Sequence, residues 1–244
     1  MDIHKPKPWH SLREFLKEYV IIVVGVLTAL AAEQGVEWLH WSQKVEAGRA
    51  AVRAELATAA NDAEERVLMR DCWERRVSYL QDQLDSAHGV WPGRPWALLA
   101  DTPQGFARGE AYGSTIRNWN SEVWRGLVAD GTAVHFPRSE MLGYARIYHF
   151  VDVLQAENQQ EWQQLARVAV LGRPLRLSDP AAYETAVALE DARRKNRLMA
   201  LGASQLLGQL DGARAMPTSA RYRDRIADLH ARAARCLADP TGAG

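Results

Sequence analysis

The stretch EYVIIVVGVLTALAAEQGVEWLHW, residues 18–41, carries the strongest structural signal in the chain. From Tyr19 to Ala32 it has no charged side chain and consists mostly of Val, Ile, Leu and Ala. Extended through Leu39 it covers about 20 residues, or about 30 Å of α-helix, which matches the hydrocarbon thickness of a bilayer. The stretch therefore predicts a transmembrane anchor over residues 18–41 that contacts the lipid bilayer.

Tryptophans flank the apolar stretch. Trp9 precedes it, and Trp38 and Trp41 lie at its far end. Because indole rings favour the headgroup level of a bilayer, these three residues are predicted to mark the two membrane interfaces. Packing of the same rings in a protein core is the alternative.

Basic residues before the stretch favour one orientation. Those after it belong to a long domain, to which the positive-inside rule gives little weight. We therefore expect a single pass through a bacterial inner membrane, with a short cytoplasmic tail at residues 1–17 and a periplasmic domain at residues 42–238. The basic residues that precede the stretch are Lys5, Lys7, Arg13 and Lys17.

Two alternatives to an uncleaved anchor stay open. Ala29-Leu30-Ala31 follows a basic segment and fits the A-x-A pattern of a cleaved signal peptide. Against cleavage, Glu14 and Glu18 precede the apolar run, and no turn-forming residues follow it. The other alternative is a buried helix of a soluble protein, because the uncharged run itself is short.

Small residues recur at three- and four-residue spacing within the anchor. Gly25, Thr28, Ala29 and Ala32 leave one side of the helix nearly flat, which lets another membrane helix approach closely. Glu33 continues this face, and it either joins such a contact or lies among the headgroups. We expect the face to contact a membrane protein partner or a second copy of the chain.

Helical periodicity continues beyond the anchor. Residues 43–87 contain no proline and one glycine, and their apolar positions follow a single stripe at helical spacing. The stripe is rich in alanine and interrupted, which favours packing in a bundle over a regular coiled coil. Its members are Val45, Val52, Leu56, Ala59, Ala63, Val67, Trp73, Val77, Leu80 and Leu84.

Breaks rich in glycine and proline divide the rest of the chain. GVWPGRPW, residues 89–96, ends the long helix. Ser178-Asp179-Pro180 is a strong helix start, because it combines a capping side chain with a proline in the first turn. In the helix predicted at residues 138–171, the spacing of apolar residues places Trp162 on the buried face. The further helices are predicted at residues 114–129, 138–171, 178–210 and 220–237.

No stretch shows the alternation typical of a strand, so the predicted fold is all-α. One N-terminal transmembrane helix continues into a long helix, and an antiparallel bundle of four or five helices follows within residues 42–238. Residues 239–244 are expected to form a flexible tail.

The two cysteines bear on the cellular compartment of the domain. Cys72 and Cys236 are far apart and form no CxxC pair, so neither a zinc site nor a thioredoxin-like motif is indicated. In a periplasmic domain they are predicted to pair as a disulfide that clips the last helix onto the long one. The alternative is two unrelated buried thiols.

Composition and motifs argue against several functions. Lys plus Arg and Asp plus Glu are equal at 30 each, which is a poor basis for general nucleic-acid binding. The sequence contains no Walker loop, GxSxG elbow, HExxH helix or EF-hand loop. His135 is the best isolated candidate for a polar site, although a histidine that caps a turn is the simpler interpretation. The basic runs at 193–197 and 221–235 are interpreted mostly as solvated helix faces.

Two segments resemble a known group. LREFLKEYVIIVVGVLTALAAEQ, residues 12–34, is similar to the opening of a group of bacterial single-pass inner-membrane proteins, and STIRNWNSEVWRGLVADGTAVHFP, residues 114–137, to their middle segment. The resemblance implies the topology of an N-terminal anchor and a helical extracytoplasmic domain. No activity is assigned to that group, so the resemblance implies none here.

We expect a non-enzymatic interaction or scaffold protein without cofactor or metal. It would act as an accessory subunit of an inner-membrane complex or as a homo-oligomer, and nothing in the sequence points to a particular small molecule. The alternative is a periplasmic ligand-sensing module that acts through a separate signalling partner.

Overall fold

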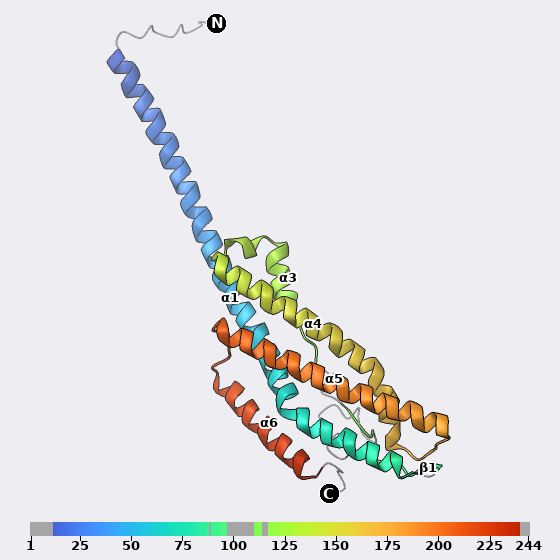
Figure 1. Ribbon diagram of the computed structural model, residues 1–244. Helices are drawn as coiled ribbons and strands as arrows, with labels where there is room; N and C mark the ends of the chain where they lie inside the picture. Colours follow the sequence, from blue (N-terminus) through green and yellow to red (C-terminus); the bar gives the residue numbers. More distant parts are fainter. Residues whose placement is uncertain (1–11, 88, 97–109, 114–116, 240–244) are drawn as a thin grey trace.

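The computed structural model describes residues 12–87, 89–96, 110–113 and 117–239. These residues form five α-helices, two short 3₁₀-helices and one pair of two-residue strands (Figure 1). The predicted all-α fold is confirmed. The α-helices are α1 (Leu12–Asp85), α3 (Glu122–Ala129), α4 (Arg138–Ala169), α5 (Asp179–Gly212) and α6 (Ala220–Ala238).

Helix α1 is continuous over 74 residues and is divided between two environments. Its first half projects from the bundle, and its second half forms the support on which the domain is built (Figure 1). Val52, Leu56 and Leu80 of the predicted stripe are fully buried. A helix of this length extends about 110 Å, so one continuous helix joins the exposed apolar segment to the domain.

The bundle consists of α4, α5 and α6 packed around the second half of α1. Helix α5 lies against both α1 and α4, and α6 lies against α1. The direction alternates from α4 to α5 to α6, while α1 runs in the same direction as α4 and α6 (Figure 1). Side chains of Ser178 and Ser219 cap α5 and α6 by accepting hydrogen bonds from backbone N–H groups, so the predicted start at Ser178 is confirmed.

The apolar core is divided into two clusters along the bundle axis. The cluster nearer to the anchor includes Leu56, Trp124 and Tyr148. The farther cluster includes Trp73 and Leu189. Charged and amide side chains occupy the level between them, and this layer is described below.

Three sequence predictions were wrong in detail. Val90–Trp91 and Leu175–Arg176 pair as antiparallel strands β1 and β2, which are too short to show alternation. The helix predicted from residue 114 begins only at Glu122 among the described residues. Trp162 is 62% exposed, because its neighbour Glu161 occupies the inward position on α4.

Residues 117–121, before α3, form no helix or strand, and side chains of α4 bind them. The backbone N–H of Trp119 donates to Gln155 Oε1 over 3.0 Å, and the Ser121 hydroxyl donates to Asp152 Oδ1 over 2.6 Å. These acceptors come from another part of the chain, so local helical spacing could not predict them.

Candidate functional site

The first half of α1 is bare. In the described part of the chain, one helix is long and apolar enough to cross a membrane, and none of its most apolar window is buried. Ile21, Ile22 and Leu27 are all exposed. By length and composition this segment fits a membrane anchor or a signal sequence.

The small-residue face of α1 has no partner among the described residues. Gly25, Thr28, Ala29, Ala32 and Glu33 are all exposed on the projecting half of the helix. A Cβ added at Gly25 would meet nothing within 4 Å. The Thr28 hydroxyl donates to the carbonyl of Val24 over 2.8 Å, so its polar group is satisfied within the helix. The face is therefore open to another helix.

The three tryptophans predicted at the membrane interfaces have different environments. Trp9 lies outside the described residues. Trp38 is exposed. Trp41 stacks on His135, with ring centroids 3.7 Å apart and planes at 15°. The interface role predicted for Trp38 and Trp41 stays a prediction, and His135 takes part in a packing contact.

Trp41 and His135 belong to a collar where the domain meets the projecting half of α1. The collar consists of α1 from Trp41 to Arg49, α3, the 3₁₀-helix η1 (Thr132–His135) and the first turn of α4 (Figure 1). Gly48 allows Leu127 of α3 to pack closely against α1, because a Cβ at Gly48 would lie 3.0 Å from Leu127 Cδ2.

One bidentate ion pair locks the collar. Arg49 Nε and Nη2 donate to the two carboxylate oxygens of Glu140 over 2.8 and 2.9 Å. This guanidinium holds the pKa of Glu140 below its usual range. The collar thus braces the domain against α1 just beyond the anchor.

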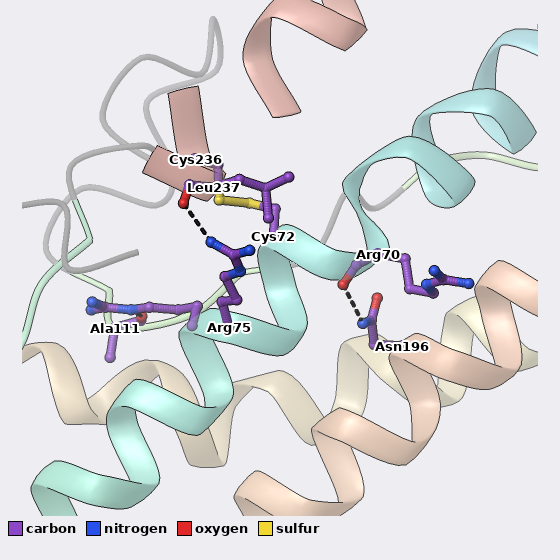
Figure 2. Close-up of a disulfide and its surroundings, with 8 residues drawn as sticks. Arg70, Cys72, Arg75, Ala111, Asn196, Cys236 and Leu237 are labelled. Carbon is purple, nitrogen blue, oxygen red and sulfur yellow. Dashed lines mark hydrogen bonds between the residues drawn. A yellow bond between two sulfur atoms is a disulfide. The ribbon is translucent and has the colours of Figure 1, made fainter. Parts of the chain in front are cut away.

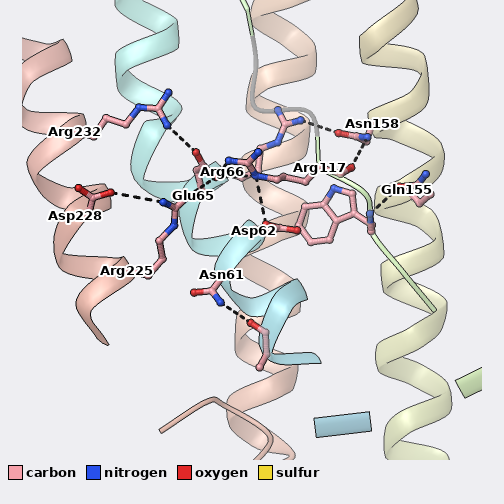
Figure 3. A network of polar contacts seen from close by, with 12 residues as sticks. Asn61, Asp62, Glu65, Arg66, Arg117, Gln155, Asn158, Arg225, Asp228 and Arg232 are labelled. Atoms are coloured by element: carbon pink, nitrogen blue, oxygen red, sulfur yellow. Dashed lines mark hydrogen bonds and ion pairs between the residues drawn. The ribbon is translucent and has the colours of Figure 1, made fainter. Parts of the chain in front are cut away.

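A buried polar layer crosses the middle of the bundle (Figure 3). Glu65 of α1 accepts from Arg117 over 2.6 Å and from Arg232 of α6 over 3.1 Å. Arg225 of α6 lies 3.7 Å from the same carboxylate. Glu65 thereby joins α1 to α6 and to the segment before α3.

The second part of the layer joins α1 to α4. Arg66 donates to both carboxylate oxygens of Glu161 over 3.0 and 2.5 Å, and to the Asn158 amide oxygen over 3.1 Å. The side chains of Arg66 and Glu161 are 0% and 3% exposed. Arg66 also lies over the ring of Trp73, with 5.4 Å between its Cζ and the ring centroid.

Sequence reasoning missed this layer and interpreted its basic residues as solvated. On α6, Arg225 and Arg232 share helical spacing with the buried Leu229 and Cys236, which is a signal that could have placed them inward. On α5, Lys195 is mostly buried and donates to Glu157 over 2.5 Å. Five basic residues of the two runs pair with acids on neighbouring helices, namely Arg193, Lys195, Arg197, Arg225 and Arg232. The other basic residues of the runs are exposed, as predicted.

The layer links helices through ion pairs. Its carboxylates and guanidiniums pair with one another between the two apolar clusters. Within the described ranges, no group of three or more His, Cys, Asp or Glu side chains could hold a metal ion. The arrangement joins α1 to α4, to α6 and to the segment before α3.

Asp62, at the edge of the layer, predicts a pH-dependent stability. Burial raises its pKa to about 6, and nearby Glu65 adds to this, although Arg117 at 3.5 Å acts in the opposite direction. The unfolded value is about 3.9. The folded chain therefore binds the extra proton between about pH 4 and 6, and the contribution of Asp62 to stability falls as the pH rises through that range.

We expect Asp62→Asn to gain about 1–3 kcal/mol relative to the parent protein between pH 4 and pH 7, from a shift of about two pKa units. Urea unfolding of both proteins at pH 4, 5, 6 and 7 measures this difference. The comparison cancels the other carboxylates, which both proteins share. Parallel stability curves would contradict the raised pKa.

The two cysteines are joined in the structure (Figure 2). Cys72 of α1 and Cys236 of α6 form a disulfide with their Cα atoms 5.6 Å apart. Beside it, Arg75 Nη1 donates to the carbonyl of Leu237 over 2.7 Å. The geometry agrees with the predicted pairing, and the bond ties the end of α6 to α1.

Comparison with known proteins adds no family. No protein-family model, no curated protein and no solved structure matches the chain.

Proposed function

We propose that the protein is a non-enzymatic, membrane-anchored helical scaffold that binds a membrane protein partner or a second copy of itself. The observation that carries this proposal is the bare apolar half of α1, which continues without a break into the buried half. A fully buried Val, Leu or Ile side chain is worth about 1.5–3 kcal/mol relative to an exposed one. So many exposed apolar side chains on one helix require a covering medium, and lipid supplies it.

The proposed location is the bacterial inner membrane, with residues 1–17 in the cytoplasm and residues 42–238 in the periplasm. The basic residues before the anchor favour this orientation. The Cys72–Cys236 disulfide supports it, because disulfides persist in the oxidising periplasm and are rare in the cytosol.

The topology is tested by single cysteines added to the intact chain. Val134→Cys lies at an exposed position of η1, and Asp2→Cys lies in the proposed cytoplasmic tail. The native cysteines are buried and paired, so they can stay in place. A membrane-impermeant maleimide on cells with a permeabilised outer membrane should label Val134→Cys alone, and both positions after lysis. Labelling of intact cells at Asp2→Cys alone would show the opposite orientation, with the N-terminus in the periplasm.

The proposed partner contact is tested on the small-residue face. Gly25→Leu puts a bulky side chain on that face. Val20→Leu puts the same side chain about 140° around the helix axis from Gly25. A bulky side chain on this face prevents the close approach of a second helix, so Gly25→Leu should weaken association on the order of 10-fold, or about 1.4 kcal/mol.

The measurement is chemical crosslinking and gentle-detergent co-purification from native membranes. Val20→Leu should retain the partner or the dimer at the parent level. Equal recovery with both variants, or no stoichiometric membrane partner and no dimer with the parent chain, would reject the contact face.

A further inference from the structure

An open groove lies at the end of the bundle nearest to the anchor. It has a volume of about 930 Å³ and is formed by α4, by the C-terminal end of α5 with the turn that follows, and by Arg53 of α1. Neither the ion-paired layer nor the anchor contributes to it. It therefore calls for an explanation of its own.

Glycines create the space. Gly143 of α4 and Gly208 and Gly212 of α5 line the groove, and a Cβ added at any of them would meet nothing within 4 Å. At Gly202, by contrast, a Cβ would lie 2.8 Å from Leu154 Cδ2, so that glycine serves helix packing. Glycine within a helix destabilises it relative to alanine. The lining glycines therefore lower helix stability without making a close helix contact, and the space beside them stays open.

The charge of the lining is positive. Arg53, Arg146 and Arg214 face one lining acid, Glu140, which Arg49 already neutralises. Arg53 has a single exposed ion pair with Glu46, at 3.5 Å. Within the described residues, Arg146 and Arg214 make no ion pair and no side-chain hydrogen bond. Both residues are exposed in the groove lining, so a ligand can reach their guanidiniums.

Two further features belong to the lining. The side-chain oxygen of Gln209 is buried without a hydrogen-bond partner among the described residues. Arg214 has a φ of +54°, in the left-handed region where glycine is usual. An arginine at this strained position extends the cationic lining beyond the end of α5.

We propose that the groove binds an anionic ligand that carries phosphate groups. Guanidiniums pair with phosphate oxygens in bidentate, charge-assisted hydrogen bonds. The phosphate comes either from a soluble compound or from a lipid headgroup. About 12 residues of helix, or about 18 Å, separate Trp41 from Arg53, so a soluble ligand has direct access while a headgroup must rise from the bilayer. This proposal goes beyond the scaffold role and does not depend on the orientation of the anchor.

The test uses the full chain in nanodiscs. In phosphatidylcholine discs, pyrophosphate is titrated by calorimetry at low salt. In a second arm, discs that contain phosphatidylglycerol are compared with phosphatidylcholine discs by the fluorescence of a probe on Leu142→Cys, an exposed position at the groove. Saturable binding of pyrophosphate identifies a soluble ligand, and a probe response to phosphatidylglycerol alone identifies a headgroup.

Paired variants assign the binding to the groove. Arg146→Ala/Arg214→Ala should weaken binding on the order of 10- to 100-fold, because two charge-assisted contacts are lost. Gly208→Leu should block it by filling the groove. The controls are Arg194→Ala, which lies outside the groove, and Gly126→Leu, where an added Cβ also meets open space. No binding in either arm, or equal binding by groove and control variants, would overturn the proposal.

Discussion

Replacing Glu161 with leucine is expected to destabilise the domain by about 3–5 kcal/mol, the usual effect of leaving one member of a buried ion pair behind. Arg66 has no access to solvent, and its two strongest hydrogen-bond acceptors are the carboxylate oxygens of Glu161. Asn158 would be the one acceptor left to it among those described, and an amide oxygen does not neutralise a guanidinium.

Urea unfolding of the full chain in a mild detergent, followed by tryptophan fluorescence, measures this effect. The double variant Arg66→Met/Glu161→Leu should recover stability to within about 1 kcal/mol of the parent, because it leaves neither member of the pair buried without its partner. Asp191→Leu removes the acid from the more exposed Arg194–Asp191 pair and should change stability by less than about 1 kcal/mol. Equal effects of Glu161→Leu and Asp191→Leu would show that the layer is not the buried network described above.

Reduction of the Cys72–Cys236 disulfide is expected to lower the free energy of unfolding by about 5 kcal/mol on the chain-entropy model, because the bond closes a very long loop. The two cysteines are 164 residues apart in the sequence. The loss should be greatest at the end of α6, where the disulfide and the Arg75–Leu237 hydrogen bond together hold the helix to α1.

Unfolding curves with and without dithiothreitol measure the global effect, and hydrogen exchange along α6 locates it. Cys72→Ser/Cys236→Ser should resemble the reduced protein under both conditions. Exchange should remain slow around Arg225 and Arg232, since Glu65 still binds both after reduction. Identical unfolding curves for the oxidised and reduced parent protein would contradict the stabilising role of the bond.

The buried ion pairs and the disulfide lie at neighbouring levels of the same bundle and contribute to its structure in different ways. The stripe of α1 is rich in alanine, and such a surface allows a neighbouring helix several registers. We infer that the pairs of Glu65 and Arg66 select one register, because a shift of α4 or α6 by one turn would leave buried charges unpaired. The disulfide then holds α6 in that register at its far end.

Local sequence determined the elements of this protein. The apolar run of residues 18–41 predicted the bare half of α1, the stripe from Val45 to Leu84 predicted its buried half, and Ser178 predicted the start of α5. Each of these signals lies within a few turns of one helix, so spacing and capping suffice to recognise it. The same rules misplaced Trp162, because they cannot tell which of two adjacent positions on a helix meets a partner.

Apart from the Cys72–Cys236 pair, which the sequence predicted, only the tertiary structure decided which distant residues meet. Glu161 lies 95 residues beyond Arg66, and Arg232 lies 167 residues beyond Glu65. The groove likewise unites Arg53, Arg146 and Arg214, which belong to three separate parts of the chain. A charged residue at a helical position looks the same in the sequence whether it faces water or a buried partner. The free energy that separates these cases comes from desolvation and from an opposite charge on another helix, and neither exists until the helices pack.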